Sequence, residues 1–362
     1  MTLRVGLVGP LPPPFGGMAN QTRQLAELLR GEGVVVSLVQ TNARYRPRWI
    51  GGFPFVRALF RLIPYVFSLW RLAGRCDLVH LMANSGWSWH LFAMPAIWTA
   101  KVRGKPVVVN YRGGDAEKFL AGSRRVVSAS MRQAAALIVP SGFLKAVFER
   151  SGMAATIVPN VVDVRRFRNP SPHRAIRRHL LVARNLEPIY DNETAIRAFA
   201  IVHRAYPEAT LTIAGAGPLA GALRELAEDL GLIAAVRFAG RLDRGAMAQA
   251  CRQADIALNP SLVDNMPNSI LEALASGLPI VSTHVGGIPF VVEHERTALL
   301  VPPGSPDLMA RAILRLMRDP ALAARLIDNG LEDIGRYTWE RVWPLLSGVY
   351  DSHAPVADRP AI

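Results

Sequence analysis

Cysteine is scarce in this sequence of 362 residues, which contains only Cys76 and Cys251. The two lie far apart, and neither belongs to a Cys-x-x-Cys pair or to a cluster with histidine. This scarcity argues against a disulfide framework and a structural zinc site, and it fits a reducing cytoplasm. Asp-x-Asp motifs are also missing, and the eight histidines lack the spacing of metal ligands. We therefore expect no metal and no cofactor.

A membrane-spanning segment and a leader are not expected either. The longest uncharged stretch, 78–100, contains histidine, asparagine, serine and proline, whose polar or helix-breaking groups are costly in hydrocarbon. The amino terminus has no apolar core followed by a small-residue cleavage site, and residues 1–9 are typical of a buried first strand. Half of the residues are apolar and 19% are charged, which excludes a disordered chain. The length predicts about two folded domains.

Lysine is nearly absent as well, since Lys101, Lys105, Lys118 and Lys145 are the only lysines among 42 basic residues. The formal net charge is +14, which favours anionic partners such as phosphorylated small molecules, anionic membranes or nucleic acid. A general bias toward arginine explains the excess equally well. No aromatic platform or basic helix of a known docking type accompanies the charge, so we expect no nucleic-acid partner.

The segment 53–72 combines apolar residues at helical spacing with arginines. The apolar positions are Phe55, Leu59, Leu62, Ile63, Val66 and Trp70, and the arginines are Arg57, Arg61 and Arg71. Such a helix suits an interface with anionic lipid, although the same pattern also serves for packing on the helix's own domain. Pro54 and Pro64 argue against a single long helix. An anionic membrane surface is therefore one expected partner.

Strand-like apolar runs alternate with helical patterns along the whole chain, which is typical of parallel α/β layers. The first series has strands at 4–8, 34–40, 77–81, 107–111, 136–139 and 156–158. The second has strands at 179–183, 210–214, 236–239 and 256–259. Between the two series, 169–178 is basic, contains proline and lacks periodicity, as a linker does.

This organisation predicts two doubly wound, Rossmann-like domains that face an interdomain cleft, with the active site in that cleft. We expect an N-terminal acceptor-binding domain at 1–168, a linker at 169–178 and a C-terminal nucleotide-sugar-binding domain at 179–335. The remaining residues, 336–362, are expected to form a helix that crosses back to the first domain.

The most informative segment, 261–283, combines a polar loop with the start of a helix. Asn265 is suited to cap that helix, with Pro267 in its first turn, and Gly277 is suited to end it. A helix start offers backbone N–H groups and a positive dipole end to a phosphate. Asp264 and Glu272 could then hold hydroxyl groups of a sugar and a ribose. A capping aspartate and a solvated glutamate remain the alternative interpretation.

This segment resembles the retaining glycosyltransferases of family 4, which have the GT-B architecture. Their pattern Glu-Gly-x-Pro-x-x-x-Leu-Glu-Ala-x-Ala-x-Gly-x-Pro-Val-Val is matched here from Pro267 to Val281. The resemblance implies that Asp264 faces the donor sugar and Glu272 holds the nucleotide ribose. It also implies donor contacts from the intervening residues Asn265, Met266, Pro267, Asn268 and Ser269. This chain departs from the pattern in having Asp264 for the first glutamate and Asn265 for the glycine.

Further segments resemble the same family. They are Pro12-Pro-Pro-Phe-Gly-Gly17, Val158-Pro-Asn-Val-Val-Asp163, Ile213-Ala-Gly-Ala-Gly-Pro218, Phe238-Ala-Gly240, Val285-Gly-Gly287 and Leu300-Val-Pro-Pro303. By this resemblance, Gly16, Gly17, Gly215 and Gly217 lie at the donor. Each match is weak alone, because such pairs are common in turns, but their shared order is specific.

Arginines take two further positions of the resemblance. Arg184 opens a segment like the family's Gly-Arg-x-x-x-x-Lys-Gly, in which Tyr190 stands near the place of the missing lysine. Its planar fork suits the phosphates of a leaving group, and a surface salt bridge is the alternative. Arg112 stands where the family often has histidine, and we expect it to contact phosphate or sugar unless Arg112-Gly-Gly is only a strained turn. Asp115 is a candidate acceptor contact.

The resemblance therefore implies a retaining, metal-independent glycosyltransferase that moves a sugar from a nucleotide-diphosphate donor to a hydroxyl acceptor. Arg184, Asp264 and Glu272 are its candidate catalytic residues, and a lipid-linked saccharide in cell-surface polysaccharide or glycolipid synthesis is a candidate acceptor. We expect a cytoplasmic protein, peripheral on the inner face of the cell membrane.

Alternatives remain open at this point. A non-catalytic GT-B protein that binds nucleotide sugar or glycolipid is one, and a hydrolase or epimerase on the same fold is another. A nicotinamide oxidoreductase is disfavoured, because no acidic ribose ligand follows the strand at 236–239.

Overall fold

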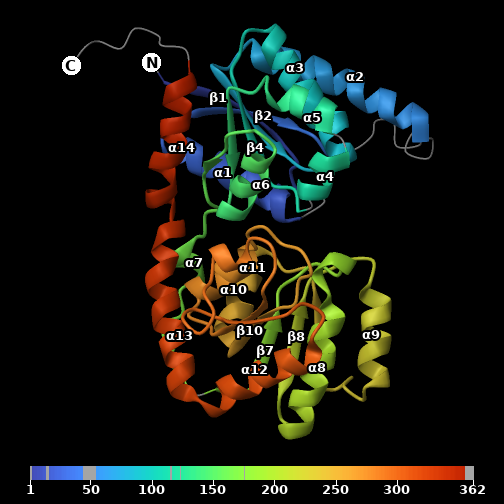
Figure 1. Ribbon diagram of the computed structural model, residues 1–362, viewed down its shortest axis with the longest axis vertical. Helices are drawn as coiled ribbons and strands as arrows, with labels where there is room; N and C mark the ends of the chain where they lie inside the picture. The colour runs from blue at the N-terminus through green and yellow to red at the C-terminus, as the bar shows by residue number, and fades with distance from the viewer. Residues whose placement is uncertain are drawn as a thin grey trace. The chain divides into compact units, whose positions relative to one another are not determined.

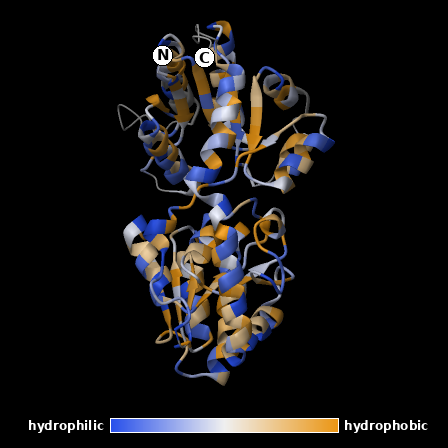
Figure 2. Ribbon diagram, turned by 90° about the vertical axis from the view of Figure 1, so that its left-hand side faces the viewer, coloured by the Kyte–Doolittle hydropathy of each residue, from blue (hydrophilic) through white to orange (hydrophobic). Residues whose placement is uncertain are grey.

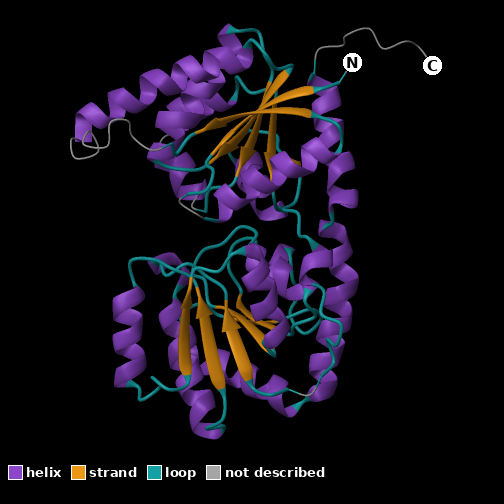
Figure 3. Ribbon diagram, turned by 180° about the vertical axis from the view of Figure 1, so that it is seen from behind, coloured by secondary structure: helices purple, strands orange, loops and turns teal. Residues whose placement is uncertain are grey.

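A computed structural model describes residues 2–13, 16–43, 54–114, 116–122, 124–174 and 176–354 (Figure 1). The chain forms two compact units. Unit 1 comprises Met1–Pro159 together with Trp343–Ile362, and unit 2 comprises Asn160–Val342. Each unit contains a parallel sheet with helices on its faces (Figure 3), so the predicted pair of doubly wound α/β units is confirmed.

Unit 1 has the strand order β2-β1-β3-β4-β5-β6, and the paired strands are parallel. The strands are β1 (Arg4–Gly9), β2 (Val35–Gln40), β3 (Leu78–Ala83), β4 (Val107–Tyr111), β5 (Ala136–Val139) and β6 (Thr156–Ile157). The helices are α1 (Gly17–Gly31), α2 (Pro54–Ala73), α3 (Met94–Val102), α4 (Ala116–Gly122), α5 (Arg124–Met131) and α6 (Gly142–Arg150), with a π-helical turn at Trp89–Ala93. The C-terminal helix α14 (Trp339–His353) begins in unit 2 and continues into unit 1.

Unit 2 has the strand order β12-β11-β10-β7-β8-β9, again with parallel pairs. The strands are β7 (His179–Val182), β8 (Thr210–Ala214), β9 (Val236–Gly240), β10 (Ile256–Asn259), β11 (Ile280–Thr283) and β12 (Leu299–Val301). The helices are α7 (Val164–Phe167), α8 (Asn192–Ala205), α9 (Ala220–Asp229), α10 (Arg244–Gln253), α11 (Asn268–Ala275), α12 (Pro306–Arg318) and α13 (Pro320–Asp333), with short 3₁₀ turns at Pro188–Tyr190, Ile288–Phe290 and Ile334–Tyr337.

Each sheet is the centre of its unit's hydrophobic core. The strands β3, β4, β10 and β11 are buried along their whole length, as expected for parallel strands covered on both faces. Figure 2 shows the strands as largely hydrophobic and the helices as hydrophobic on part of their surface only. In unit 1 the largest buried side chains include Trp89, Tyr111 and Phe148. The loops that follow the strands are thereby held at one edge of each sheet.

Three expectations are corrected by the structure. The segment that follows Phe53 forms one helix, α2, with Pro64 inside it, because the buried face at Tyr65 and Leu69 packs on the core and offsets the lost hydrogen bond. Phe53 itself lies outside the described residues. The helix α11 begins at Asn268 rather than being capped by Asn265.

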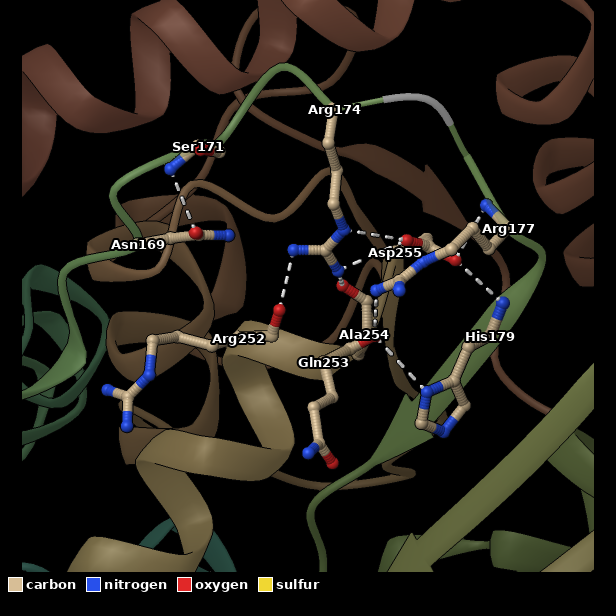
Figure 4. Close-up of polar contacts among 9 residues, drawn as sticks. All are labelled: Asn169, Ser171, Arg174, Arg177, His179, Arg252, Gln253, Ala254 and Asp255. Atoms are coloured by element: carbon tan, nitrogen blue, oxygen red, sulfur yellow. Dashed lines mark hydrogen bonds and ion pairs between the residues drawn. The ribbon is translucent and has the colours of Figure 1, made fainter.

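The third correction concerns the linker. The division between the units falls after Pro159, and the expected linker 169–178 belongs to unit 2. Arg174 anchors this segment through bonds to Asp255 and to the carbonyl oxygens of Arg252 and Ala254 (Figure 4). Within the described ranges, no helix combines the length and apolar character needed to cross a bilayer.

Candidate active site

The densest group of predicted site residues lies where β7 and β10 end. These two strands are neighbours in the sheet, and the carboxyl ends of parallel strands share one edge. Arg184 follows β7, and Asp264 lies in the loop after β10. Their side chains form an ion pair in which the arginine is 9% exposed and the aspartate 12%. The same guanidinium donates to Ser269 Oγ at 3.3 Å and lies 4.0 Å above the centre of the Tyr190 ring.

Two glycines fix the loop that carries Asp264. A Cβ atom at Gly286 would lie 2.2 Å from the Asp264 carbonyl oxygen, and one at Gly287 would lie 1.7 Å from the Asn265 carbonyl oxygen. The Gly287 N–H donates to the Asp264 carbonyl at 2.9 Å. The Gly-Gly pair was recognised in the sequence only as part of the family resemblance, and the structure gives its physical reason: only glycine allows these two backbones to touch.

Asn160 supports the start of α11 from a distant part of the chain. Its Nδ2 donates at 2.9 Å both to the Met266 carbonyl and to Asn268 Oδ1. The N-cap residue of α11 is Pro267, whose side chain has no polar group to cap the helix, and Asn160 holds the residues before the first turn. Asn160 lies within the matched segment 158–163, but local sequence does not place it at the site, because its partners lie more than 100 positions later.

Glu272 lies on α11, one turn from its start. Burial raises the pKa of its carboxyl group to about 7, against the opposing pull of Arg244 and Arg184. Burial also raises the pKa of Asp264, while Arg184 and the Asn265 N–H favour its charged form. Perturbed acids beside a cation at a strand edge are typical of a functional site.

Gly215 and Gly217 lie against the backbone that carries Arg184. A Cβ atom at Gly215 would lie 1.9 Å from the Arg184 carbonyl oxygen, and one at Gly217 would lie 2.3 Å from that of Leu186. The Leu186 N–H donates to the Ala216 carbonyl at 3.2 Å. These glycines therefore let the loop after β8 pack against the loop after β7, and their predicted contact with a donor stays a prediction.

Unit 1 presents its own set of predicted residues. Gly16 occupies the N-cap position of α1, and both Gly16 and Gly17 face open space among the described residues. Arg112 follows β4, and its guanidinium donates to Asn110 Oδ1 at 2.8 Å and to Gln21 Oε1 at 3.1 Å.

The turn after Arg112 is crowded rather than strained. A Cβ atom at Gly113 would lie 2.6 Å from the Tyr111 hydroxyl, so glycine is required there for space. Asp115, the candidate acceptor contact, lies outside the described residues.

The predicted residues thus fall into two sets, one in unit 2 and one in unit 1. The unit 2 set is Arg184, Tyr190, Gly215, Gly217, Asp264, Asn265, Met266, Pro267, Asn268, Ser269 and Glu272. The unit 1 set is Gly16, Gly17 and Arg112. Among the described ranges, no group of three or more histidine, cysteine, aspartate or glutamate side chains is placed to hold a metal ion.

Comparison with known families gives two matches that divide the chain much as the structure does. The family described as Glycosyltransferase Family 4 matches residues 15–166. The family described as Glycosyl transferases group 1 matches residues 177–319. Together they cover the unit 2 sheet and all strands of the unit 1 sheet except β1.

Individual proteins are similar over most of the chain. The phosphatidyl-myo-inositol mannosyltransferase of Mycobacterium leprae is 25% identical over 97% of this chain and 97% of its own length. The D-inositol 3-phosphate glycosyltransferase of Saccharomonospora viridis is 27% identical over 76% of this chain and 70% of its own. Among solved structures, HepE from Anabaena in complex with UDP-glucose superimposes with a TM-score of 0.75 at 18% identity, over 96% of this chain and 98% of that one.

Proposed function

Because the chain belongs to the family 4 glycosyltransferases, we propose that it moves a sugar from a nucleoside diphosphate to a hydroxyl acceptor, without a metal ion and with retention of the anomeric configuration. The observation that carries this proposal is the partly buried group of Arg184, Asp264 and Ser269 beside the start of α11. It places a cation and a helix N-terminus side by side, and both attract phosphate.

Arg184 is the proposed stabiliser of the leaving group. Cleavage of the sugar–phosphate bond puts negative charge on the diphosphate, and a fixed guanidinium lowers the energy of that charge. The ion pair with Asp264 and the Tyr190 ring hold the guanidinium in place before a donor binds. Tyr190 stands near the position of the family's lysine. In place of that second positive charge, this chain has an aromatic ring against which the Arg184 guanidinium packs.

The two acids have separate proposed roles. Asp264 Oδ1 accepts from the Asn265 N–H at 2.9 Å and Oδ2 pairs with Arg184, so both oxygens are held in place and the donor sugar would use their remaining lone pairs. Glu272 has a partly buried carboxylate, and hydroxyl groups of a ribose would supply hydrogen bonds that favour its charged form. These roles follow the family resemblance and the burial of both groups.

Relatives support the classes of donor and acceptor. HepE was solved with UDP-glucose, which favours a nucleotide sugar as the donor. The two relatives are named for transfer to phosphatidyl-myo-inositol and to D-inositol 3-phosphate, both of which carry a polyol hydroxyl near a phosphate. We therefore propose a hydroxyl acceptor that is phosphorylated or lipid-linked.

A basic aromatic surface on α2 and α3 supports a peripheral membrane location, on the cytoplasmic face. Exposed apolar side chains recur along it, including Ile63 (61%), Phe67 (59%) and Trp70 (44%) on α2 and Trp98 (42%) and Val102 (71%) on α3. Cations lie over its rings: Arg71 over Phe67 at 5.7 Å, Arg103 over Trp70 at 4.7 Å and Lys101 over Trp98 at 5.4 Å. Aromatic and basic side chains together are suited to an anionic lipid interface.

The test of the transfer reaction is a panel of nucleoside diphosphates and nucleotide sugars, measured by thermal shift in EDTA. We expect one nucleotide to stabilise the wild type and not Glu272→Ala, and the corresponding nucleotide sugar to be turned over with the anomeric configuration of the donor retained. Binding without turnover on any phosphorylated or lipid-linked acceptor would favour the non-catalytic alternative, and a flat panel would contradict a nucleotide site.

The membrane location is tested separately by co-sedimentation with liposomes. We expect the wild type to bind vesicles with anionic lipid, and Phe67→Ser/Trp70→Ser to weaken that binding. Equal binding of the two proteins, or none by the wild type, would contradict the proposed surface.

A further inference from the structure

A chain of polar side chains runs through the otherwise apolar interior of unit 1. It begins at Tyr350 on α14, whose hydroxyl lies 2.7 Å from His80 Nδ1 on β3. His80 Nε2 lies 3.0 Å from Asn110 Nδ2 on β4, and Asn110 Oδ1 accepts from Arg112 Nε at 2.8 Å. Tyr350 and His80 are fully buried, and Asn110 is 2% exposed. The chain thus connects the C-terminal helix with the arginine at the end of β4.

The hydrogen bonds of this chain have one consistent direction. Because Asn110 Oδ1 accepts from Arg112, its amide nitrogen faces His80 and donates to Nε2. Burial and the nearby Arg112 lower the pKa of His80 to about 3, so the ring is neutral at physiological pH. Its single proton is therefore on Nδ1, which donates to the Tyr350 hydroxyl. Donation thus runs from Arg112 to Asn110, from Asn110 to His80 and from His80 to Tyr350, and this order fixes the Asn110 amide and the His80 tautomer.

The row of hydrogen-bonded side chains ends at Arg112, at the edge where a doubly wound sheet binds ligands. In unit 1 the strand order reverses between β1 and β3, and ligands bind at the carboxyl ends next to such a reversal. Arg112 leaves β4 at that edge and reaches Gln21 on α1, the helix that follows β1. Its guanidinium is thereby drawn toward the reversal point. Burial lowers its pKa only to about 10, so it stays charged.

A buried polar chain costs more than apolar packing of the same volume, unless every member is satisfied. We propose that His80, Asn110 and Tyr350 are positioning residues, which hold the Arg112 guanidinium in the orientation in which it contacts the anionic donor. This inference rests on the proposed function. An arginine side chain has several rotatable bonds, and anchoring its Nε through three buried residues removes much of that freedom before the donor arrives.

The first test is a double-mutant cycle on the full-length enzyme. Asn110→Ala is expected to raise the KM for the donor about tenfold and Tyr350→Phe about threefold, with little change in kcat, since each loses a hydrogen bond that orients Arg112. In an Arg112→Gln background neither substitution should raise KM further. Full additivity of the effects would overturn the proposal, because a merely structural role does not depend on Arg112.

Tyr65→Phe is the matched control. Tyr65 is also buried in unit 1 and loses the same hydroxyl group, which donates to the Phe92 carbonyl at 2.9 Å instead of joining His80, Asn110 or Tyr350. It is expected to lower the melting temperature without changing the KM for the donor. A rise in KM as large as that of Tyr350→Phe would count against the proposal.

The second test needs no activity. Nitrogen-15 NMR should show His80 as the neutral Nδ1–H tautomer, and the exchange of the Arg112 Nε proton with water should quicken in Asn110→Ala and Tyr350→Phe. Unchanged exchange in both variants, or the Nε2–H tautomer, would overturn the proposal. Absence of both nucleotide binding and transfer in the wild type would instead contradict the proposed function, and the exchange measurement would still decide whether these residues hold Arg112.

Discussion

The neighbouring strands β7 and β10 carry an arginine–aspartate pair at each end, and the two pairs differ in how completely their polar atoms are satisfied. At the amino ends, Asp255 accepts from Arg174 and from the N–H groups of Arg177 and His179, both at 2.9 Å (Figure 4). Arg174 also donates to two backbone carbonyls, so four of the five guanidinium N–H groups have partners. Such a pair leaves little for a ligand to bind.

The pair at the carboxyl ends is less complete. Among the described residues, Arg184 Nε has no hydrogen-bond partner, and one face of the guanidinium rests on the Tyr190 ring. Glu272 lies near it with a raised pKa. The two arginine–aspartate pairs therefore have different roles. Arg174 and Asp255 hold the segment 169–178 in place, and the pair of Arg184 and Asp264 still has a polar atom available to bind a ligand.

The largest expected effect is the difference in kcat between variants of the two arginines. Arg184→Ala should lower kcat by about 10²–10³-fold, because the variant lacks the guanidinium N–H groups that would stabilise the negative charge developing on the diphosphate. Arg174→Ala, the matched control at the other end of the strands, should leave the kcat of the folded enzyme within about twofold. Initial rates normalised to folded protein check this. Equal losses in both variants would remove the distinction between the pairs.

The effects of the two arginine substitutions on stability should have the opposite order. Arg174→Ala leaves Asp255, whose side chain is 2% exposed, without its cation, and should lower the free energy of unfolding by about 3 kcal/mol. Arg184→Ala should cost less, since Asp264 is more exposed, at 12%. Urea denaturation measures both. A larger loss for Arg184→Ala would show that the pair at the carboxyl ends is the structural one.

The support of the Asp264 loop predicts a smaller effect on activity. Gly287→Ala forces a Cβ atom into the Asn265 carbonyl, so the loop must shift and kcat should fall about tenfold. Gly335→Ala is the control, because nothing lies within 4 Å of the added atom there. If Gly287→Ala folds and keeps full activity, the position of Asp264 does not matter for transfer.

A pH dependence should come from Glu272. With its pKa near 7, the ionised fraction rises from about a tenth at pH 6 to about nine tenths at pH 8, so nucleotide affinity should rise several-fold across that range. Glu272→Gln should remove this part of the dependence. Calorimetric titrations of both proteins at the two pH values test it, and an unchanged profile in Glu272→Gln would assign the dependence elsewhere.

The same group affects the ligand-free protein. Because its pKa in the folded state lies above the unfolded value of 4.5, the folded protein holds this proton more tightly. Its contribution to stability is therefore present below about pH 4.5 and is lost as the pH rises through about 7. Glu272→Gln should raise the melting temperature at pH 8 and change it little at pH 4.

Local sequence patterns were sufficient for the elements and the outline of the site. The strands at 107–111, 136–139, 210–214 and 256–259 lie where periodicity predicts them. The start of α11 was misplaced because Asn265 has the chemistry of a cap, while its backbone is held instead by contact with Gly287. That contact spans 22 positions, and no local pattern contains it.

The misassigned linker has the same cause. Residues 169–178 have the composition of a linker, yet Arg174 donates a hydrogen bond to Asp255, 81 positions away. Tyr350 and His80, 270 positions apart, likewise could not be paired from sequence. Local sequence patterns predict which residues lie at the ends of the strands. Only the structure shows which of these residues form hydrogen bonds or ion pairs with one another.

The most direct test of the central claim is a calorimetric titration of the stabilising nucleoside diphosphate into the wild type, Arg184→Ala and Arg174→Ala. The account predicts at least tenfold weaker binding for Arg184→Ala and wild-type affinity for Arg174→Ala. Wild-type affinity in Arg184→Ala would contradict it, because the diphosphate would then not depend on the pair at the carboxyl ends of β7 and β10.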